Sequence, residues 1–107
     1  MTASCLQVFV TYPDRRTAER AALGLVKKKL AACGQIIGPV KSVYRWRGRI
    51  AKGAEFLCLF KTTGKQYRKF EQAVKQGHPY EVPEIVAVPI AKGSAQYLKW
   101  LEKGVSR

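Results

Sequence analysis

The sequence predicts an α+β fold with the order strand–helix–strand–strand–helix–strand and a short helix at the C-terminal end. Two observations support it. Segments rich in β-branched and aromatic residues alternate with segments of helical periodicity, and Gly, Pro, Asp or Ser stands where one element gives way to the next. This order is the ferredoxin-like arrangement. The length of 107 residues suits a single domain, spanning residues 1–107.

The first strand and the first helix are separated by a proline and a capping residue. Residues 6–12 are β-branched and aromatic, and the run stops at Pro13. Asp14 occupies an N-cap position, where its carboxylate accepts from amides that the first helical turn leaves unpaired. The helical pattern predicts a helix of about five turns, which ends at Cys33 with Gly34 as its left-handed cap.

The next two segments are predicted to form a hairpin. Strand character covers residues 36–46 and is interrupted at Gly38-Pro39, which indicates an edge strand with a bulge or bend. Residues 47–49 form a tight turn. Residues 54–61 include five consecutive apolar side chains, a pattern typical of a central strand that is buried on both faces.

The remaining elements follow in the same way. A second helix is expected to open at Thr63 or Gly64 and to end near Gly77, before a loop that contains Pro79. A fourth strand over residues 82–90 is bracketed by prolines and is therefore predicted to be the other edge. Ser94 can cap the final helix.

The predicted sheet has more apolar surface than two helices can cover. Two helices cover one face of a four-stranded sheet, yet the first and third strands carry apolar residues on both faces. A large exposed apolar patch is uncommon on a soluble monomer. We therefore predict a homo-oligomer whose sheets pack together, with Tyr44 and Trp46 at the end of the long second strand as interface candidates.

The chain is strongly basic, with 20 Lys and Arg against 7 Asp and Glu and a net charge of +13. This balance attracts anions at short range. The alternative is a solvated surface without a charged partner. Because the basic residues are spread along the chain without a basic tail, nucleic acid is the less favoured partner.

Scarce residue types exclude several classes of site. A single His and a single Asp leave no room within one chain for a multi-histidine zinc site or an EF-hand. Three Cys without C-x-x-C spacing indicate reduced thiols with a structural role. The absence of a membrane-length apolar run or a secretory signal completes the expectation of a cytoplasmic protein.

Several motifs together resemble one known family, the CutA-type divalent-cation tolerance proteins. The most specific stretch is residues 78–85, His-Pro-Tyr-Glu-Val-Pro-Glu-Ile; the others are residues 11–14, 29–33, 42–48, 61–63, 89–90 and 97–101. The resemblance implies a ferredoxin-like subunit similar to PII-type signalling proteins, assembled as a tight homotrimer. It also implies a non-enzymatic role in tolerance of copper and other divalent metals.

The same resemblance suggests where a metal ion would bind. The copper site proposed for the family uses a cysteine at the position of Val10 and paired histidines at the positions of Gly77 and His78. Only His78 remains as a metal ligand, with copper or another divalent cation as the possible cofactor. Because such ions prefer three or four N/S donors, neighbouring subunits would have to add ligands such as Cys33 or Glu84.

The 78–84 segment is also a candidate ligand pocket. Its expected lining is Tyr80, Glu81 and Glu84, with Lys61 contributed across a subunit boundary, and its ligand would be a small ion or an anion. In the structural alternative, His78 bonds a carbonyl, Glu84 pairs with Lys61, and the loop only stabilises the trimer. Two other functions stay open. One is a basic trimer that binds polyanions or nucleic acid, and the other is a small hydrolase with His78 as its base.

Overall fold

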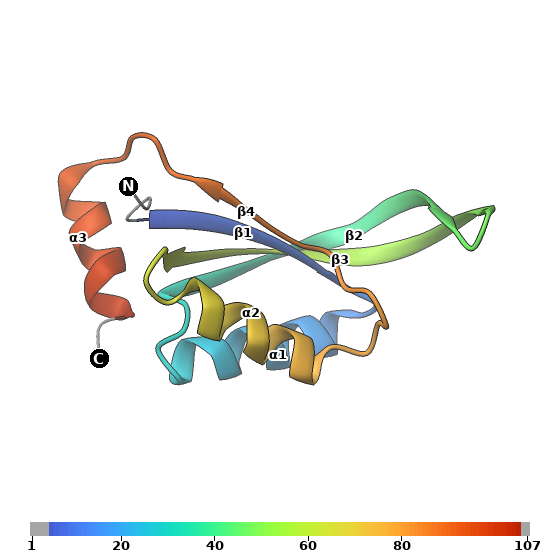
Figure 1. Ribbon diagram of the computed structural model, residues 1–107, viewed down its shortest axis with the longest axis horizontal. Helices are drawn as coiled ribbons and strands as arrows, with labels where there is room; N and C mark the ends of the chain where they lie inside the picture. The colour runs from blue at the N-terminus through green and yellow to red at the C-terminus, as the bar shows by residue number, and fades with distance from the viewer. Residues whose placement is uncertain (1–4, 106–107) are drawn as a thin grey trace.

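The computed structural model describes residues 5–105, which form a four-stranded antiparallel sheet and three helices (Figure 1). The ends of the predicted domain, residues 1–4 and 106–107, lie outside the described residues. The elements are β1 Cys5–Tyr12, α1 Arg15–Lys27, β2 Cys33–Trp46, β3 Arg49–Thr63, α2 Tyr67–Gly77, β4 Ile85–Pro89 and α3 Ala95–Gly104. The predicted ferredoxin-like α+β fold is confirmed.

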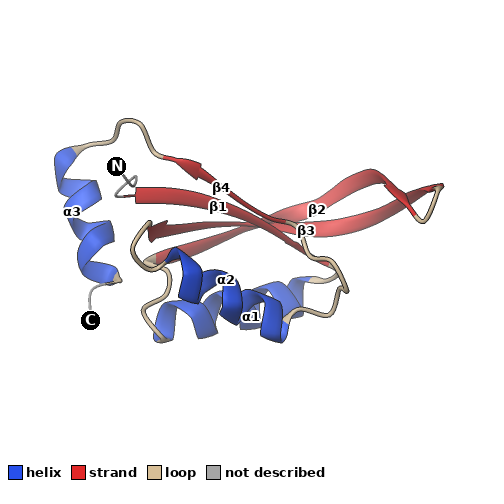
Figure 2. Ribbon diagram, in the orientation of Figure 1, coloured by secondary structure: helices blue, strands red, loops and turns tan. Residues whose placement is uncertain are grey.

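The strand order is β2-β3-β1-β4, so the two proline-bearing strands are the edges, as the sequence predicted. Helices α1 and α2 cover one face of the sheet, and α3 packs across one end of it (Figure 2). Alternate residues of the central strands point toward α1 and α2 and form the core with them. The largest fully buried core side chains include Tyr12, Phe60, Phe70, Val8 and Val10.

Helix α1 begins where the sequence predicted and ends earlier. Asp14 Oδ1 accepts from the Thr17 amide at 2.8 Å. At the other end Lys29, not Gly34, takes the left-handed conformation, with φ of 59°. The Lys29 amide then donates to the Val26 carbonyl at 3.0 Å and the Leu30 amide to the Leu25 carbonyl at 3.0 Å. This is a Schellman motif, and it ends the helix at Lys27 instead of Cys33.

Gly34 lies inside β2, where it pairs with Phe60. A Cβ at this position would lie 2.8 Å from the Phe60 ring. The glycine is therefore required by close packing against a buried ring, and its predicted role as a helix cap is wrong.

Other boundaries also differ from the prediction because strand pairing overrides the local pattern. Strand β2 starts at Cys33 instead of residue 36, and β3 starts at Arg49 instead of residue 54. Strand β3 runs to Thr63 because pairing with β1 continues to Cys5, so α2 starts only at Tyr67. The Thr63 hydroxyl accepts from the Gln66 amide in the intervening turn. Strand β4 is shorter than predicted, because its pairing with β1 begins only at Ile85, opposite Val10. Ser94 caps α3 as predicted, since its Oγ accepts from the Tyr97 amide at 3.1 Å.

Strands β2 and β3 form a long hairpin that projects beyond the rest of the sheet (Figure 1). The predicted irregularity is present, because the pairing register shifts between Ile37 and Val40. At the tip Arg47 and Gly48 both have positive φ, 52° and 76°. Positive φ at both central residues is the geometry of the tight turns that match strand twist.

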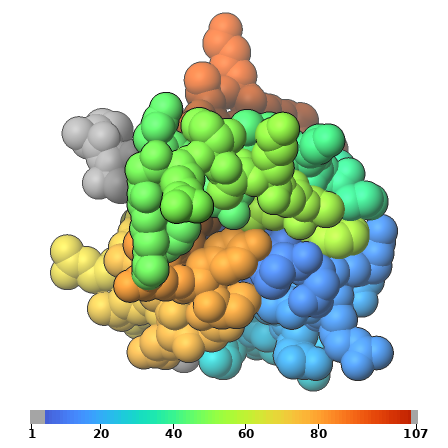
Figure 3. Space-filling view, turned by 90° about the vertical axis from the view of Figure 1, so that its right-hand side faces the viewer, coloured from blue at the N-terminus to red at the C-terminus, as the bar shows by residue number. Residues whose placement is uncertain are grey.

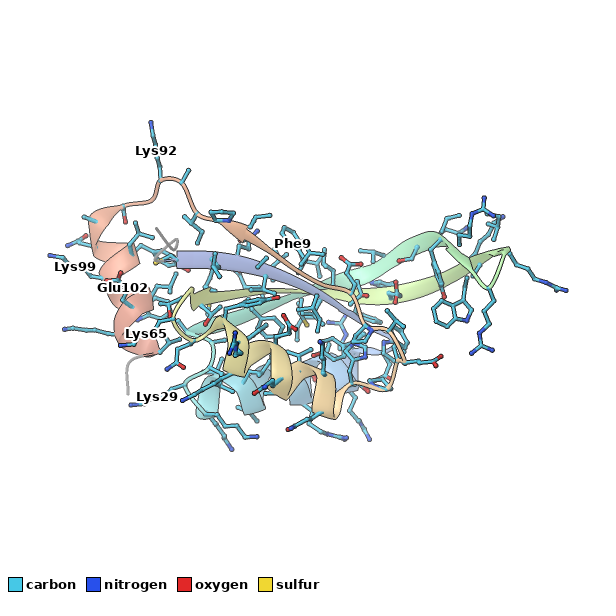
Figure 4. All side chains as sticks on the ribbon, in the orientation of Figure 1. Phe9, Lys29, Lys65, Lys92, Lys99 and Glu102 are labelled. Carbon is cyan, nitrogen blue, oxygen red and sulfur yellow. The ribbon has the colours of Figure 1, made fainter. Side chains whose placement is uncertain are left out.

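The sheet face opposite α1 and α2 carries an apolar patch, the outer face. Phe9 lies at its centre, paired with Leu59 of β3 and Val86 of β4. Phe9 lies on the side of the sheet away from α1 and α2 (Figure 4). Ile37 and Val86 are about half exposed, at 48% and 50%. The outer-face residues are Phe9, Ile37, Leu57, Leu59, Val86 and Val88.

Candidate functional site

A cleft opens where the outer face meets the projecting hairpin. Its volume is about 820 Å³, and it lies between the hairpin and the loop of residues 79–84. Figure 3 shows the hairpin and this loop as neighbours at that end of the molecule. Thr11 and Glu55 contribute from the central strands, and Lys41 from β2. The volume falls in the range of small-ligand sites.

The cleft brings together five of the residues singled out by the sequence. Tyr44 and Trp46 line one wall, while Tyr80, Glu81 and Glu84 line the other. Lys61 is not part of it, because this residue pairs with Gln7 and Cys33 near the opposite end of β1. There the Lys61 Nζ donates to Gln35 Oε1 at 3.5 Å. Within one chain, Lys61 therefore lies apart from the 79–84 loop.

His78 is held by contacts on both ring nitrogens. Nε2 lies 2.7 Å from the Thr11 carbonyl oxygen, and Nδ1 accepts from the Tyr80 amide at 3.1 Å. Since a carbonyl only accepts, Nε2 carries the proton and the ring is neutral. The ring also stacks on Tyr12, with centroids 4.5 Å apart. Burial lowers the pKa of His78 and outweighs the raising effects of the Thr11 carbonyl and the Glu55 carboxylate.

Two further contacts fix the loop against the hairpin. The Tyr80 hydroxyl donates to Glu55 Oε2 at 2.7 Å. Burial and this hydrogen bond both raise the pKa of Tyr80, so the phenol stays protonated. At the rim, Arg47 Nη2 donates to Glu81 Oε1 at 3.3 Å, a solvent-exposed pair of little energetic weight.

The cleft is more acidic than the chain as a whole. Of the seven acidic residues in the sequence, Glu55, Glu81 and Glu84 line it, with Lys41 as the one basic residue in the lining. Glu55 was not among the residues that the sequence predicted for this site. The sequence did carry a signal, because Glu55 alternates with Leu57 and Leu59 and therefore lies on the same side of the sheet as the outer face. The lining favours a cationic ligand over an anionic one.

The residues of one chain do not fit a preformed copper site. Val10 is fully buried under the helices, and both nitrogens of His78 are already engaged. Cys33 lies next to Tyr97, its Sγ 3.8 Å from the Tyr97 hydroxyl, and not beside the cleft. Residues 5–105 contain no group of three or more His, Cys, Asp or Glu side chains that could hold a metal ion. A metal role for His78 stays a prediction.

The half-buried His78 predicts a pH effect on stability. In the unfolded chain the imidazole has its ordinary pKa of 6.5, and in the folded chain its pKa is lower. Between these two pKa values the unfolded chain binds a proton that the folded chain does not. Stability therefore falls as pH drops from 6.5 toward the lowered folded pKa. In urea titrations at pH 7.5 and 5.5, His78→Gln should lose less stability on acidification than the unmodified protein. An equal loss of stability in both proteins would contradict the neutral state of the half-buried ring.

Fold and cleft together define a class: a small ferredoxin-like protein with an uncovered apolar sheet face and a ligand-sized cleft at its margin. Residues 6–104 match the family described as CutA1 divalent ion tolerance protein. The chain belongs to this family.

Relatives and solved structures agree with that assignment. The chain is 45% identical over 96 residues to the divalent-cation tolerance protein CutA of Thermus thermophilus, covering 90% of this chain and 93% of that protein. It is 38% identical to the chloroplastic protein CutA of Arabidopsis thaliana, covering 94% of this chain but only 56% of that longer protein. The crystal structure of CutA from Xylella fastidiosa superposes with a TM-score of 0.94 at 32% identity, covering 97% of this chain and all of that one.

Among residues 5–105, every helix is too short or too polar to cross a membrane.

Proposed function

We propose that this protein is a non-enzymatic divalent-cation tolerance protein that acts as a homotrimer and binds a divalent cation in the cleft, at a boundary between subunits. The observation that carries this proposal is the cleft itself. It gathers three carboxylates of a chain that has only seven acidic residues, at the margin of an uncovered apolar face.

The outer face supports assembly. Phe9, Leu57 and Leu59 form a continuous apolar surface with the edge-strand residues Ile37 and Val86. Burying such a surface stabilises an assembly by roughly 25 cal/mol per Å². Tyr44 and Trp46, exposed at 48% and 41%, extend the same surface onto the hairpin. A second copy packed on the outer face would therefore lie at the mouth of the cleft.

The state of His78 supports a non-catalytic role. A general base needs a free lone pair within reach of a substrate proton. The lone pair of His78 Nδ1 is occupied by the Tyr80 amide, and Nε2–H donates to Thr11. The only imidazole of the chain is thus committed to holding the 79–84 loop, which leaves the hydrolase alternative without its base.

The cation that we propose is one that accepts oxygen ligands. Glu55, Glu81 and Glu84 offer carboxylate oxygens, which suit hard divalent ions better than they suit copper. Because the described part of one chain holds no complete ligand set, donors from a neighbouring copy would have to complete the site. Copper binding through His78 would require the ring to break one of its two hydrogen bonds.

Calorimetric titration tests the proposal. Mg²⁺, Mn²⁺, Zn²⁺ and Cu²⁺ chlorides are titrated separately against the assembled protein, with ATP as an anionic probe. We expect at least one cation to bind, and Glu84→Gln to weaken it by about tenfold or more, as for a loss of ~1.4 kcal/mol. The matched control is Glu19→Gln, which removes an exposed carboxylate from α1. Two results would contradict a cation site in the cleft. One is a cation affinity that Glu84→Gln leaves unchanged, and the other is a protein that binds ATP but none of the four cations.

A cytoplasmic location is part of the proposal and rests on the sequence alone. The printed names of relatives include a chloroplastic protein from Arabidopsis thaliana and a periplasmic one from Archaeoglobus fulgidus. Fractionation of cells that express the natural gene, followed by immunoblotting, tests it. Recovery outside the cytoplasmic fraction would overturn it.

A further inference from the structure

We propose that the helix-covered side of the molecule binds the phosphate backbone of double-helical nucleic acid. This surface, the helix layer, consists of α1, α2 and their flanking turns, residues 14–29 and 65–77. The proposal does not depend on the cleft or on cation binding.

The fold gathers charges that are scattered along the sequence. The helix layer contains ten of the 20 basic residues and three of the seven acidic ones, a formal net charge of +7. All ten basic residues are solvent-exposed: Arg15, Arg16, Arg20, Lys27, Lys28, Lys29, Lys65, Arg68, Lys69 and Lys75. Within these two segments, the structure shows one ion pair, between Lys75 and Glu71 at 3.0 Å. Most of this charge is therefore available to an external anion.

The shape of the layer suits an extended polyanion. Arg16, Arg20 and Lys27 lie on the side of α1 opposite its buried residues, along a line of about 16 Å at 1.5 Å per residue. A groove of about 240 Å³ runs between α1 and α2, with Arg20 and Lys28 in its lining. Gly24 and Gly77 also line it, and a Cβ at either would meet no atom within 4 Å. A phosphate backbone can thus approach both helices closely.

The helix layer also stays accessible in the proposed trimer. It covers the face of the sheet opposite the outer face (Figure 2), so an assembly built on the outer face leaves the helices on the outside. Lys29 and Lys65, labelled in Figure 4, project from the helix side of the molecule.

The composition of the layer favours nucleic acid over a lipid surface. A helix that lies in a membrane buries a broad apolar face in the lipid boundary. The apolar side of α1, Ala18, Ala22 and Leu25, is instead buried in the protein core. In the helix layer the large exposed apolar side chains are Leu23 and Val26, at 57% and 36% exposure. Attraction here is therefore electrostatic and matches a dense line of phosphates.

Fluorescence anisotropy with a labelled DNA duplex of about 12 base pairs, at several salt concentrations, tests the proposal. The logarithm of the association constant should fall linearly with the logarithm of the salt concentration. Each phosphate contact should contribute about −0.9 to the slope. The triple variant Arg16→Gln, Arg20→Gln, Lys27→Gln should weaken binding at every salt concentration. It should also reduce the slope by about three.

The matched control removes the same charge elsewhere, with Lys92→Gln, Lys99→Gln and Lys103→Gln. These exposed residues lie on α3 and the loop before it (Figure 4 labels Lys92 and Lys99). The control should keep the original slope, and circular dichroism should show both variants folded. If both variants lost the same DNA affinity, binding would depend only on net charge, and the helix layer would not be a binding site. Failure to bind DNA at low salt, or binding to phosphatidylserine vesicles but not to DNA, would overturn the proposal.

Discussion

Replacing Phe9 with aspartate is expected to convert the proposed trimer into monomers. Phe9 lies at the centre of the outer face between Leu59 and Val86. In the assembly its side chain would be enclosed by apolar groups of a neighbouring copy. A carboxylate without a partner costs several kcal/mol in such a place, and symmetry repeats that cost in each subunit.

Light scattering coupled to size-exclusion chromatography at micromolar concentration measures the effect. The unmodified protein should elute with the mass of three chains and Phe9→Asp with that of one. Because Phe9 points away from the core, far-ultraviolet circular dichroism should stay close to that of the unmodified chain. The matched control is Leu23→Asp, which adds the same charge on the helix layer at a site that is 57% exposed.

Two results would refute the assembly. One is a monomeric unmodified protein at this concentration, which would leave the outer face in water. The other is dissociation by Leu23→Asp to the same degree as by Phe9→Asp, which would make added charge the cause instead of the face.

Much of the fold could be predicted because local patterns and tertiary contacts agree. The prolines of the edge strands and the caps at Asp14 and Ser94 act through nearby backbone, and the apolar run of β3 agrees with its place inside the sheet. The end of α1 could not be predicted. Lysine rarely takes the left-handed conformation seen at Lys29, and Gly34 offered a more typical cap. The signal at Gly34 came from the Phe60 ring, far away in sequence.

The candidate site shows the same limit. Tyr80, Glu81 and Glu84 are consecutive or nearly so, and their closeness followed from the sequence. Their placement opposite Tyr44 and Trp46 depends on how far the hairpin projects and how it twists, which pairing between distant residues decides. Lys61 was expected to reach these residues from a neighbouring subunit. Within one chain its register in β3 places it beside Gln7 of β1, away from the cleft, so that contribution stays a prediction.

Gly34→Ala is expected to destabilise the protein by about 1–3 kcal/mol, the usual cost of overpacking a core. The new methyl group would lie 2.8 Å from Phe60 Cε1 and 3.2 Å from the Ala22 Cβ. The Phe60 ring is fully buried and packs edge-on against Phe70, with centroids 5.3 Å apart, so it has little room to move. The better strand propensity of alanine returns only about 0.5–1 kcal/mol.

Urea denaturation at a fixed protein concentration measures this change, because the stability of an oligomer depends on concentration. Gly24→Ala is the matched control, since its Cβ would meet nothing within 4 Å in the middle of α1. It should leave stability unchanged or raise it by up to about 1 kcal/mol. Adding Phe60→Leu to Gly34→Ala should cost less than the sum of the two single changes, because the smaller side chain makes room for the methyl group. Close packing would not explain the glycine if Gly34→Ala left the free energy of unfolding unchanged, because the Phe60 ring would then have moved aside. Strictly additive losses of stability in the double variant would contradict the explanation as well.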